Sequence, residues 1–279
     1  KLSLYKTHIL KSVALFLPSL AIQLYLVGNK VILGAFAGYK QSGIFENANK
    51  IITVSLTAIA SIGTVTLPRL TNAFSKKNKQ DFNKVIKNSF TFLNAFSFPM
   101  MFGLILISSP FSLMFFGNSF AGAGLILCVL SPIFVFNSWS TITGYQFLLS
   151  TGQIKKYTFS TVVSSTVSFV ICLLLAPKFG ALGAAIALLA AEGTISIVQI
   201  IVTFDQIHYK NFVFDGAKYF VASLLSWLLT NFVVEFVHVR GIYLIACQAI
   251  LFILFYVILV CFFKSDIIQL AMKIILSFF

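Results

Sequence analysis

Charged residues are scarce in this sequence, and acidic ones are the scarcest. Only 7 of 279 residues are Asp or Glu, against 20 Lys or Arg, and the charged total is 10%. A soluble globular domain carries about 25% charged residues. Hydrophobic residues instead make up 59% of the chain. The composition therefore excludes an ordinary soluble domain and indicates an integral membrane protein.

The sequence also lacks the patterns of metal sites, disulfides and active sites. Its four cysteines lie inside apolar runs without CxxC spacing, so we expect no metal and no cofactor. The segments between the apolar runs contain no Ser-His-Asp, HExxH or paired-carboxylate arrangement. Those on the outer side are also too short to hold a folded catalytic domain. We therefore expect a protein that is not an enzyme.

Long apolar runs dominate what is present. A membrane-spanning helix needs about 20 mainly apolar residues, and the runs are too long and uniform for barrel strands. The predicted fold class is therefore an all-α polytopic membrane protein. Eight transmembrane helices are expected, near residues 9–36, 43–67, 89–115, 121–149, 158–176, 179–204, 218–237 and 241–263.

Basic residues favour one side of the membrane. With Lys1 in the cytoplasm, eight spans place most of the 20 Lys and Arg residues inside and only Lys40, Lys178 and Arg240 outside. The positive-inside rule then predicts that both ends of the chain are cytoplasmic. The net charge of +13 fits this topology and contact with anionic membrane lipids. No solvated basic domain is present that would bind nucleic acid.

Two basic segments lie outside the predicted spans. The chain opens with Lys rather than Met, on KLSLYKTHILK, which is typical of a linker between two membrane halves, so we expect a fragment of a longer protein. Residues 69–88 place Phe74, Phe82 and Val85 at helical spacing among basic residues. That pattern predicts an amphipathic helix lying on the inner leaflet.

Polar side chains inside the apolar runs carry the functional prediction. An ionisable group at the centre of a span costs roughly 2.5 to 3.5 kcal/mol on insertion scales, so it usually faces a cavity or a partner. In the first span Gln23 and Lys30 share a helix face. In the second span, steps of three and four form one polar stripe: Glu46, Lys50, Thr53, Thr57, Ser61 and Thr64.

The turn between these two spans predicts where the charges meet. With a turn near Tyr39, Lys30 and Lys50 lie at nearly equal depth in the outer half of the bilayer. Glu46 is one turn from Lys50 and is expected to neutralise one ammonium group. The remaining positive site suits a phosphate or pyrophosphate oxygen. Two amides flank it: Asn29 and Asn49.

An alternative interpretation needs no cavity. Lys30 and Lys50 would snorkel to the outer headgroups, and Glu46 would simply pair with one of them. That interpretation does not account for the Thr and Ser stripe, which continues inward. A polar cavity is therefore favoured.

Later spans repeat the pattern. The fourth contains Asn137 and Tyr145 in its cytoplasmic half, after Pro132, which loosens the helical hydrogen bonds. The sixth places Glu192 near mid-membrane, with Gln199 on its face. Glu192 is either a proton or cation site or a satisfied interior acid, and the sequence leaves both open.

Several segments together carry a family resemblance. They are GNKVILGAFAGYKQSGIFENANKI, IGTVTLPRLTN, FFGNSF, SPIFVFNSWSTITGYQFLLSTGQIKKYT and APKFGALGAAIALLAAE. In order and spacing, over residues 10–205, they resemble the second half of a Wzx-type polysaccharide or O-antigen flippase, of the multidrug/oligosaccharidyl-lipid/polysaccharide exporter superfamily.

The resemblance implies a domain organisation. Residues 1–8 would be a cytoplasmic linker from a missing N-terminal lobe, and residues 9–204 would form a six-helix C-terminal lobe. Residues 205–279 would add two helices and a short cytoplasmic tail. The protein would lie in a bacterial cytoplasmic membrane.

The resemblance also implies an activity. It implies alternating-access transport of an undecaprenyl-pyrophosphate-linked oligosaccharide from the inner to the outer leaflet, in an O-antigen or capsule pathway. The partners would be that substrate, membrane lipids, and the polymerase and glycosyltransferases of the same pathway. Lys30 and Lys50 would contact the anion, with Glu46 as their partner, and Glu46 or Glu192 are candidates for a coupling ion. The candidate hydrogen-bonding groups for sugar are Gln23, Asn29, Asn49, Asn137 and Tyr145.

Two other functions stay open from the sequence. A cation-coupled drug exporter of the same superfamily would favour an aromatic and acidic lining without paired lysines. A membrane glycosyltransferase or polymerase would need an outer loop rich in acid or arginine, which the sequence does not show.

Overall fold

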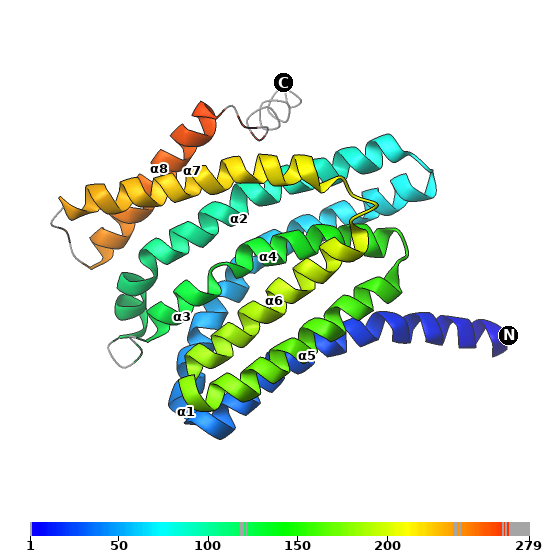
Figure 1. Ribbon diagram of the computed structural model, residues 1–279, viewed down its shortest axis with the longest axis horizontal. Coiled ribbons are helices and arrows are strands. Elements are labelled where there is room, and N and C mark those ends of the chain that lie inside the picture. The colour runs from blue at the N-terminus through cyan, green and yellow to red at the C-terminus, as the bar shows by residue number, and fades with distance from the viewer. Residues whose placement is uncertain are drawn as a thin grey trace.

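The computed structural model describes residues 2–117, 120, 122–236, 239, 241–263, 265 and 267, and within these residues it contains helices and turns but no strand. The all-α prediction is confirmed. Residues 264, 266 and 268–279 of the predicted tail, and Lys1 of the predicted linker, lie outside the described residues. The helices are α1 (Leu2–Ser75), α2 (Lys79–Phe116), α3 (Ala123–Leu130), α4 (Ile133–Ser140), a π-helix η2 (Thr141–Leu148), α5 (Ile154–Phe179), α6 (Ala181–Thr203), α7 (Tyr209–Glu235) and α8 (Ile242–Phe262) (Figure 1).

Seven helical segments of the described chain are long and apolar enough to cross a membrane. The chain is therefore a multi-pass membrane protein. The sequence predicts eight spans, and the counts differ because the first two predicted spans both fall in α1, which is helical over 74 residues. The fourth predicted span corresponds to α3, α4 and η2 together, which form one segment, Ala123–Leu148.

The helix α1 folds back on itself at Gly38. A straight helix of 74 residues would be about 110 Å long. Gly38 has φ 80° and ψ 171°, a conformation that L side chains rarely adopt, and it interrupts the helical geometry. A Cβ atom at Gly34 would lie 3.5 Å from Ser42 Oγ. The two limbs of α1, residues 2–37 and residues 39–75, therefore run side by side near the turn, as Figure 1 shows.

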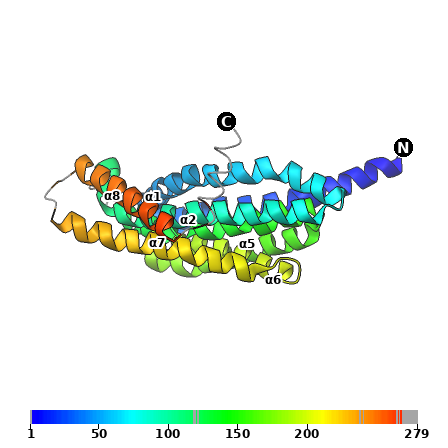
Figure 2. The same cartoon turned by 90° about the horizontal axis from the view of Figure 1, so that it is seen from above.

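The turns between helices gather at two opposite ends of the molecule. In Figure 1, the connections at 76–78, 151–153 and 204–208 lie at the right, on the side of the N-terminus. At the left lie the turn between the two limbs of α1, the turn between α5 and α6, and the ends of α2 and α7. The helices thus run antiparallel along one direction, which is also the long direction in the view from above (Figure 2).

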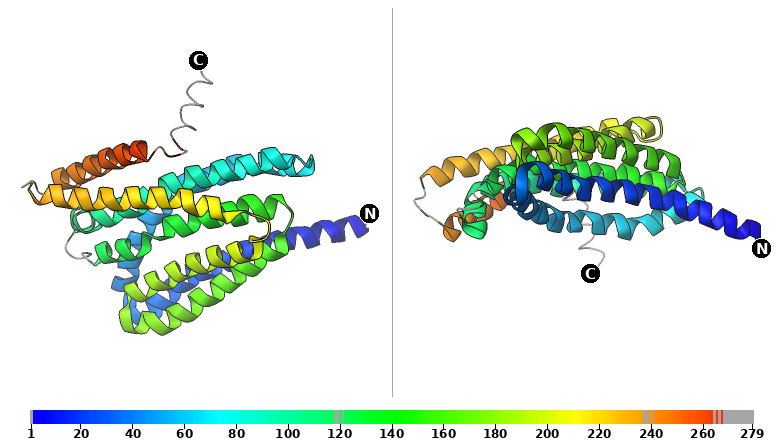
Figure 3. Two further views of the ribbon diagram at one scale, coloured as in Figure 1. Left: turned by 45° about the horizontal axis from the view of Figure 1, so that its top comes forward. Right: turned by 90° about the horizontal axis from the view of Figure 1, so that it is seen from below.

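The helices divide into two groups around the segment formed by α3, α4 and η2. The first limb of α1 packs on α5 and α6, whereas α7 and α8 pack on α2 (Figures 1 and 3). The contact between α5 and α6 is the most extensive one. It is close because Gly183 has no side chain: a Cβ atom there would collide with the backbone of Leu175 and Ala176.

The segment 69–88 differs from its prediction. It does not form one amphipathic helix, because a tight turn at 76–78 divides it between the end of α1 and the start of α2. Lys77 has φ 55°, and Asn78 caps α2 by accepting a hydrogen bond from the Asp81 N–H at 3.1 Å. Phe82 and Val85 are buried in the helix bundle. Of the apolar face that suggested a leaflet-bound helix, Phe82 and Val85 therefore pack inside the protein, whereas Phe74 is 49% exposed.

Candidate functional site

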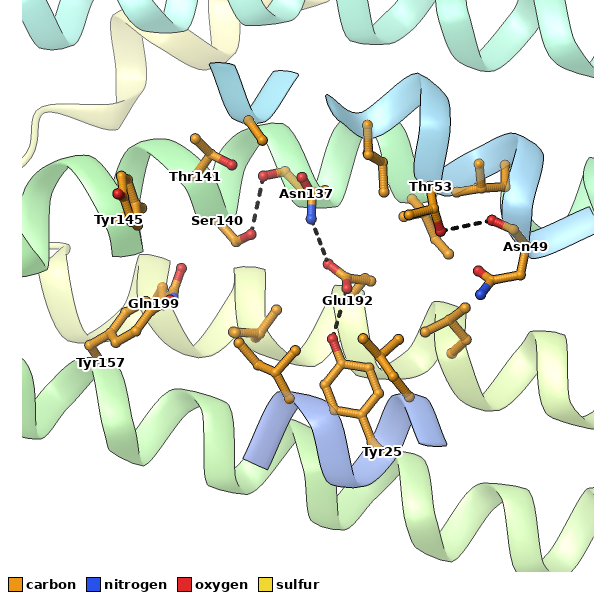
Figure 4. Close-up of a pocket in the computed structure, with 18 of the residues that line it drawn as sticks. Tyr25, Asn49, Thr53, Asn137, Ser140, Thr141, Tyr145, Tyr157, Glu192 and Gln199 are labelled. Carbon is orange, nitrogen blue, oxygen red and sulfur yellow. Dashed lines mark hydrogen bonds between the residues drawn. The ribbon is translucent and has the colours of Figure 1, made fainter. Parts of the chain in front are cut away.

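A cavity lined by both polar and apolar side chains lies inside the helix bundle. Its volume is about 380 Å³, which is the size of a small ligand pocket. Both limbs of α1 line it, together with α4, η2, α5 and α6 (Figure 4). Its polar lining residues are Tyr25, Asn49, Thr53, Thr64, Asn137, Ser140, Thr141, Tyr145, Tyr157, Glu192 and Gln199. All of these lining residues belong to the described part of this one chain.

Glu192 lies at the centre of the cavity wall and is held by two neutral donors. Its side chain comes from α6, and the residue is only 8% exposed. The Tyr25 hydroxyl donates to Oε1 at 3.0 Å, and Asn137 Nδ2 donates to Oε2 at 3.3 Å. The donors come from α1 and α4, so Glu192 ties three helices together (Figure 4). Burial makes such bonds necessary, because an unpaired carboxyl group in an apolar interior is costly.

Gln199 continues the polar wall two turns along α6. Thr143 Oγ1 donates to its Oε1 at 3.1 Å, and its Nε2 donates to Ser160 Oγ at 3.1 Å. Gly144 leaves room for this amide, since a Cβ atom there would collide with Gln199. Thr143 and Gly144 belong to the π-helix η2, and π-helical turns are often found at functional sites. The π-helix also carries Tyr145, whose ring faces the cavity (Figure 4).

The second limb of α1 forms the open side of the cavity. Its lining residues Thr53, Ala60 and Thr64 are exposed, whereas Tyr25 and Gln199 on the opposite wall are buried. The hydroxyl groups of Thr53 and Thr64 bond to the carbonyls of their own helix. They therefore present a polar but uncharged rim to any group that enters.

The predicted charged residues form a separate cluster near the Gly38 turn. Lys30 Nζ lies 2.7 Å from Glu46 Oε2, with the two side chains 40% and 31% exposed. In a straight helix, residues 16 positions apart would be separated by about 24 Å. The ion pair therefore joins the two limbs of α1 across the turn.

This ion pair corrects one prediction. Glu46 is expected from the sequence to pair with Lys50, one turn away, but the structure pairs it with Lys30. Lys50 is exposed. The fold decides the outcome, because the turn at Gly38 brings Lys30 of the first limb beside Glu46 of the second limb.

The structure brings together about half of the candidate residues. Asn49, Asn137, Tyr145 and Glu192 line the cavity. The residues Gln23, Asn29, Lys30, Glu46 and Lys50 do not line it. Glu46 precedes Asn49 by three residues, so the ion pair lies about one helical turn from the cavity.

Asn29 has a packing role in the structure. The residue is 1% exposed, and its Nδ2 donates to Ser168 Oγ of α5 at 3.0 Å. The sulfur of Cys172 lies 3.8 Å from its carbonyl oxygen. Asn29 therefore faces α5 and not Lys30. Gln23 is exposed on the surface of the first limb.

Tyr25 and Tyr157 belong to the site, although the sequence did not single them out. Both line the cavity, and Tyr25 binds Glu192 directly. The only sequence signal is a hydroxyl-bearing ring inside an apolar span, and tyrosines in spans are common at membrane interfaces. Their role follows from the packing of α1 and α5 against α6.

Comparisons with known proteins find relatives with similar names. The family model for polysaccharide biosynthesis proteins matches residues 5–125. The chain is 26% identical, over 156 residues, to a probable low-salt glycan biosynthesis flippase, Agl15, of Haloferax volcanii. It is 26% identical, over 185 residues, to a putative O-antigen transporter of Escherichia coli. The resemblance to polysaccharide flippases is confirmed.

These matches cover the chain and its relatives unequally. The Haloferax alignment covers 56% of this chain and 33% of the relative, and the Escherichia alignment covers 66% and 44%. The solved structure of the lipid II flippase MurJ, in an inward closed conformation, matches 91% of this chain and 53% of its own length. That match has a TM-score of 0.74 at 19% identity, so it shows a shared fold. The chain thus spans about a third to a half of the relatives it matches.

Proposed function

We propose that the chain is part of a flippase that moves an undecaprenyl-pyrophosphate-linked oligosaccharide between the leaflets of a cytoplasmic membrane. The observation that carries the proposal is the polar cavity inside an apolar helix bundle. Sugar hydroxyls cannot cross hydrocarbon without such a lining. The names of the relatives, a glycan biosynthesis flippase and an O-antigen transporter, support the same class of cargo.

The cluster at the Gly38 turn is suited to the pyrophosphate. Lys30 is partly exposed and already paired with Glu46, and Lys50 is exposed on the same limb as Glu46. An entering anion would bind Lys50 and compete with Glu46 for Lys30. The oligosaccharide would then reach the cavity one turn away, where Asn49, Asn137 and Tyr145 offer amide and hydroxyl groups.

The proposed topology has eight crossings. The two limbs of α1 cross separately, and both ends of the chain lie in the cytoplasm of a bacterial cell. The end with the turns at 76–78, 151–153 and 204–208 carries most of the described basic residues, which supports its cytoplasmic placement. Residues 9–204 would act as one lobe that rocks against further protein during alternating access.

The proposal includes no catalytic step. The flippase would receive its cargo from glycosyltransferases and release it to a polymerase of the same pathway. Glu46 or Glu192 would bind the coupling ion, if the transport is ion-driven.

A leaflet-sidedness assay tests this function. The full-length protein is reconstituted in vesicles with a lipid-linked oligosaccharide, and the fraction of cargo in the outer leaflet is followed over time. We expect transport by the unchanged protein and a loss of roughly tenfold or more for Lys30→Ala, because one charge-assisted contact is worth about 1.5 to 3 kcal/mol.

Lys40→Ala is the matched control, because Lys40 is an exposed lysine of the same helix beyond the turn. It should leave transport unchanged. Chemical conversion of the cargo by the purified protein, or equal transport with and without it, would contradict the proposal.

A further inference from the structure

We propose that the cavity selects the cargo by charge: it accepts uncharged or amino sugars and disfavours acidic sugars, because its described lining carries Glu192 and no basic side chain. The inference rests on the proposed flippase function and names the class of sugar that the site accepts.

The charge of the cavity lining carries the inference. Among the described residues that line it, Glu192 is the only Asp or Glu, and none is Lys, Arg or His. The two groups that bind its carboxyl oxygens are a phenol and an amide. The other polar side chains of the lining are amides and hydroxyls, and they come from the second limb of α1, α4, η2, α5 and α6. The described lining thus offers no cation that would neutralise a carboxylate.

An acidic sugar is therefore disfavoured in either protonation state of Glu192. If Glu192 is ionised, a second carboxylate in the same cavity is repelled, and the repulsion is screened less than at the surface because Glu192 is only 8% exposed. If Glu192 is protonated, the sugar carboxylate still leaves water without a charge partner. An uncharged sugar avoids both penalties, because its hydroxyl groups donate to Glu192 and Gln199. An ammonium group of an amino sugar can form an ion pair with Glu192.

The positions of the lysines strengthen the assignment. Lys30 and Lys50 lie outside the cavity lining, near the Gly38 turn. The cations therefore stand where the pyrophosphate would bind, and the acid stands where the sugar would bind. The site separates the two chemical ends of the cargo by charge.

Three matched probes test the inference on the full-length protein. They are polyprenyl-pyrophosphate disaccharides that end in glucose, in glucosamine with a free amine, or in glucuronic acid. Binding is measured in nanodiscs and leaflet transfer in vesicles. We expect the glucuronic acid probe to bind at least roughly tenfold more weakly, and to be transferred at least roughly tenfold more slowly, than the other two. A tenfold difference corresponds to about one favourable or unfavourable charge contact.

A pair of lysine substitutions tests the cause. Thr53→Lys adds a cation at the open side of the cavity, whereas Thr57→Lys adds it one turn away, at an exposed threonine outside the lining. We expect Thr53→Lys to restore binding and leaflet transfer of the glucuronic acid probe. Thr57→Lys should leave the discrimination against this probe unchanged. Glu192→Gln should reduce the preference for glucosamine over glucose.

The outcomes separate the two proposals. Equal binding and transfer of all three probes, or no difference between Thr53→Lys and Thr57→Lys, would overturn the charge selection while leaving the flippase function intact. Charge-selective binding without any leaflet transfer would support the selection and overturn the flippase function. Neither binding nor transfer of any probe would overturn both.

Discussion

The cavity and the Gly38 turn handle their ionisable groups in opposite ways. At the turn, Lys30 and Glu46 keep 40% and 31% of their side chains exposed and pair with each other. In the cavity, Glu192 is 8% exposed and is bound by an amide and a phenol. An exposed ion pair contributes little stability, whereas a buried carboxyl group needs its partners. The first arrangement leaves charge available to a ligand, and the second builds the wall that a ligand meets.

The largest expected effect on stability is at Gly144, in the cavity wall. Gly144→Val places a side chain against Gln199, and such overpacking costs about 1–3 kcal/mol in free energy of unfolding. Unfolding of the full-length protein in detergent measures the change. Gly28→Val is the control, because a Cβ atom at Gly28 meets nothing within 4 Å.

Removing the Gln199 amide should relieve this strain. The double substitution Gly144→Val and Gln199→Ala is expected to lower the free energy of unfolding by less than the sum of the two single losses. If Gly144→Val lowers the free energy of unfolding no more than Gly28→Val does, the close fit between η2 and α6 is wrong.

A smaller loss is expected at Glu192. Glu192→Ala removes the acceptor of two interhelical hydrogen bonds, and such bonds in membrane proteins average about 0.6 kcal/mol each. We therefore expect a loss of roughly 1 kcal/mol in the same unfolding measurement. Glu235→Ala, at an exposed position near the end of α7, should change little. A larger loss at Glu235 would contradict the role given to the cavity wall.

The smallest effect is expected at the turn. A double-mutant cycle with Lys30→Met and Glu46→Gln should give a coupling energy below about 1 kcal/mol that falls as salt is added. A parallel cycle with Lys50→Met and Glu46→Gln should give almost none. Stronger coupling to Lys50 would restore the pairing that the i, i+4 spacing predicts.

The contrast between the two regions also explains what the sequence could predict. Apolar run length is a property of the chain alone, so the helices and the turn near Tyr39 were predictable, and the break falls at Gly38. Polar residues inside apolar runs likewise stand out in the sequence, which singled out Asn137 and Glu192, and both line the cavity.

Contacts between distant helices were less predictable. Asn29 and Asn49 are similar amides beside similar lysines, yet Asn29 bonds to Ser168 while Asn49 lines the cavity. The difference depends on the side from which α5 approaches, and spacing within one span contains no such information. The same limit applies to Tyr25, whose partner Glu192 lies 167 residues away.

The local pattern at residues 69–88 was misleading for a related reason. An amphipathic repeat shows that one face is apolar but not what covers that face. Here the protein covers part of it, because the turn at 76–78 sends Phe82 and Val85 into the bundle while Phe74 stays exposed.

The central claim is that the cavity is open to water and does not face lipid. Accessibility to water along the second limb of α1 tests this claim most directly. In a cysteine-free version of the full-length protein, single cysteines at Thr53 and Thr64, both on the open side of the cavity, are exposed to a polar, membrane-impermeant thiol reagent. A cysteine at Leu228, an exposed apolar position of α7, serves as the reference. We predict rapid labelling at 53 and 64, slowed by lipid-linked oligosaccharide, and almost none at 228. Equally slow labelling at all three positions would show that the cavity faces lipid and would contradict the account.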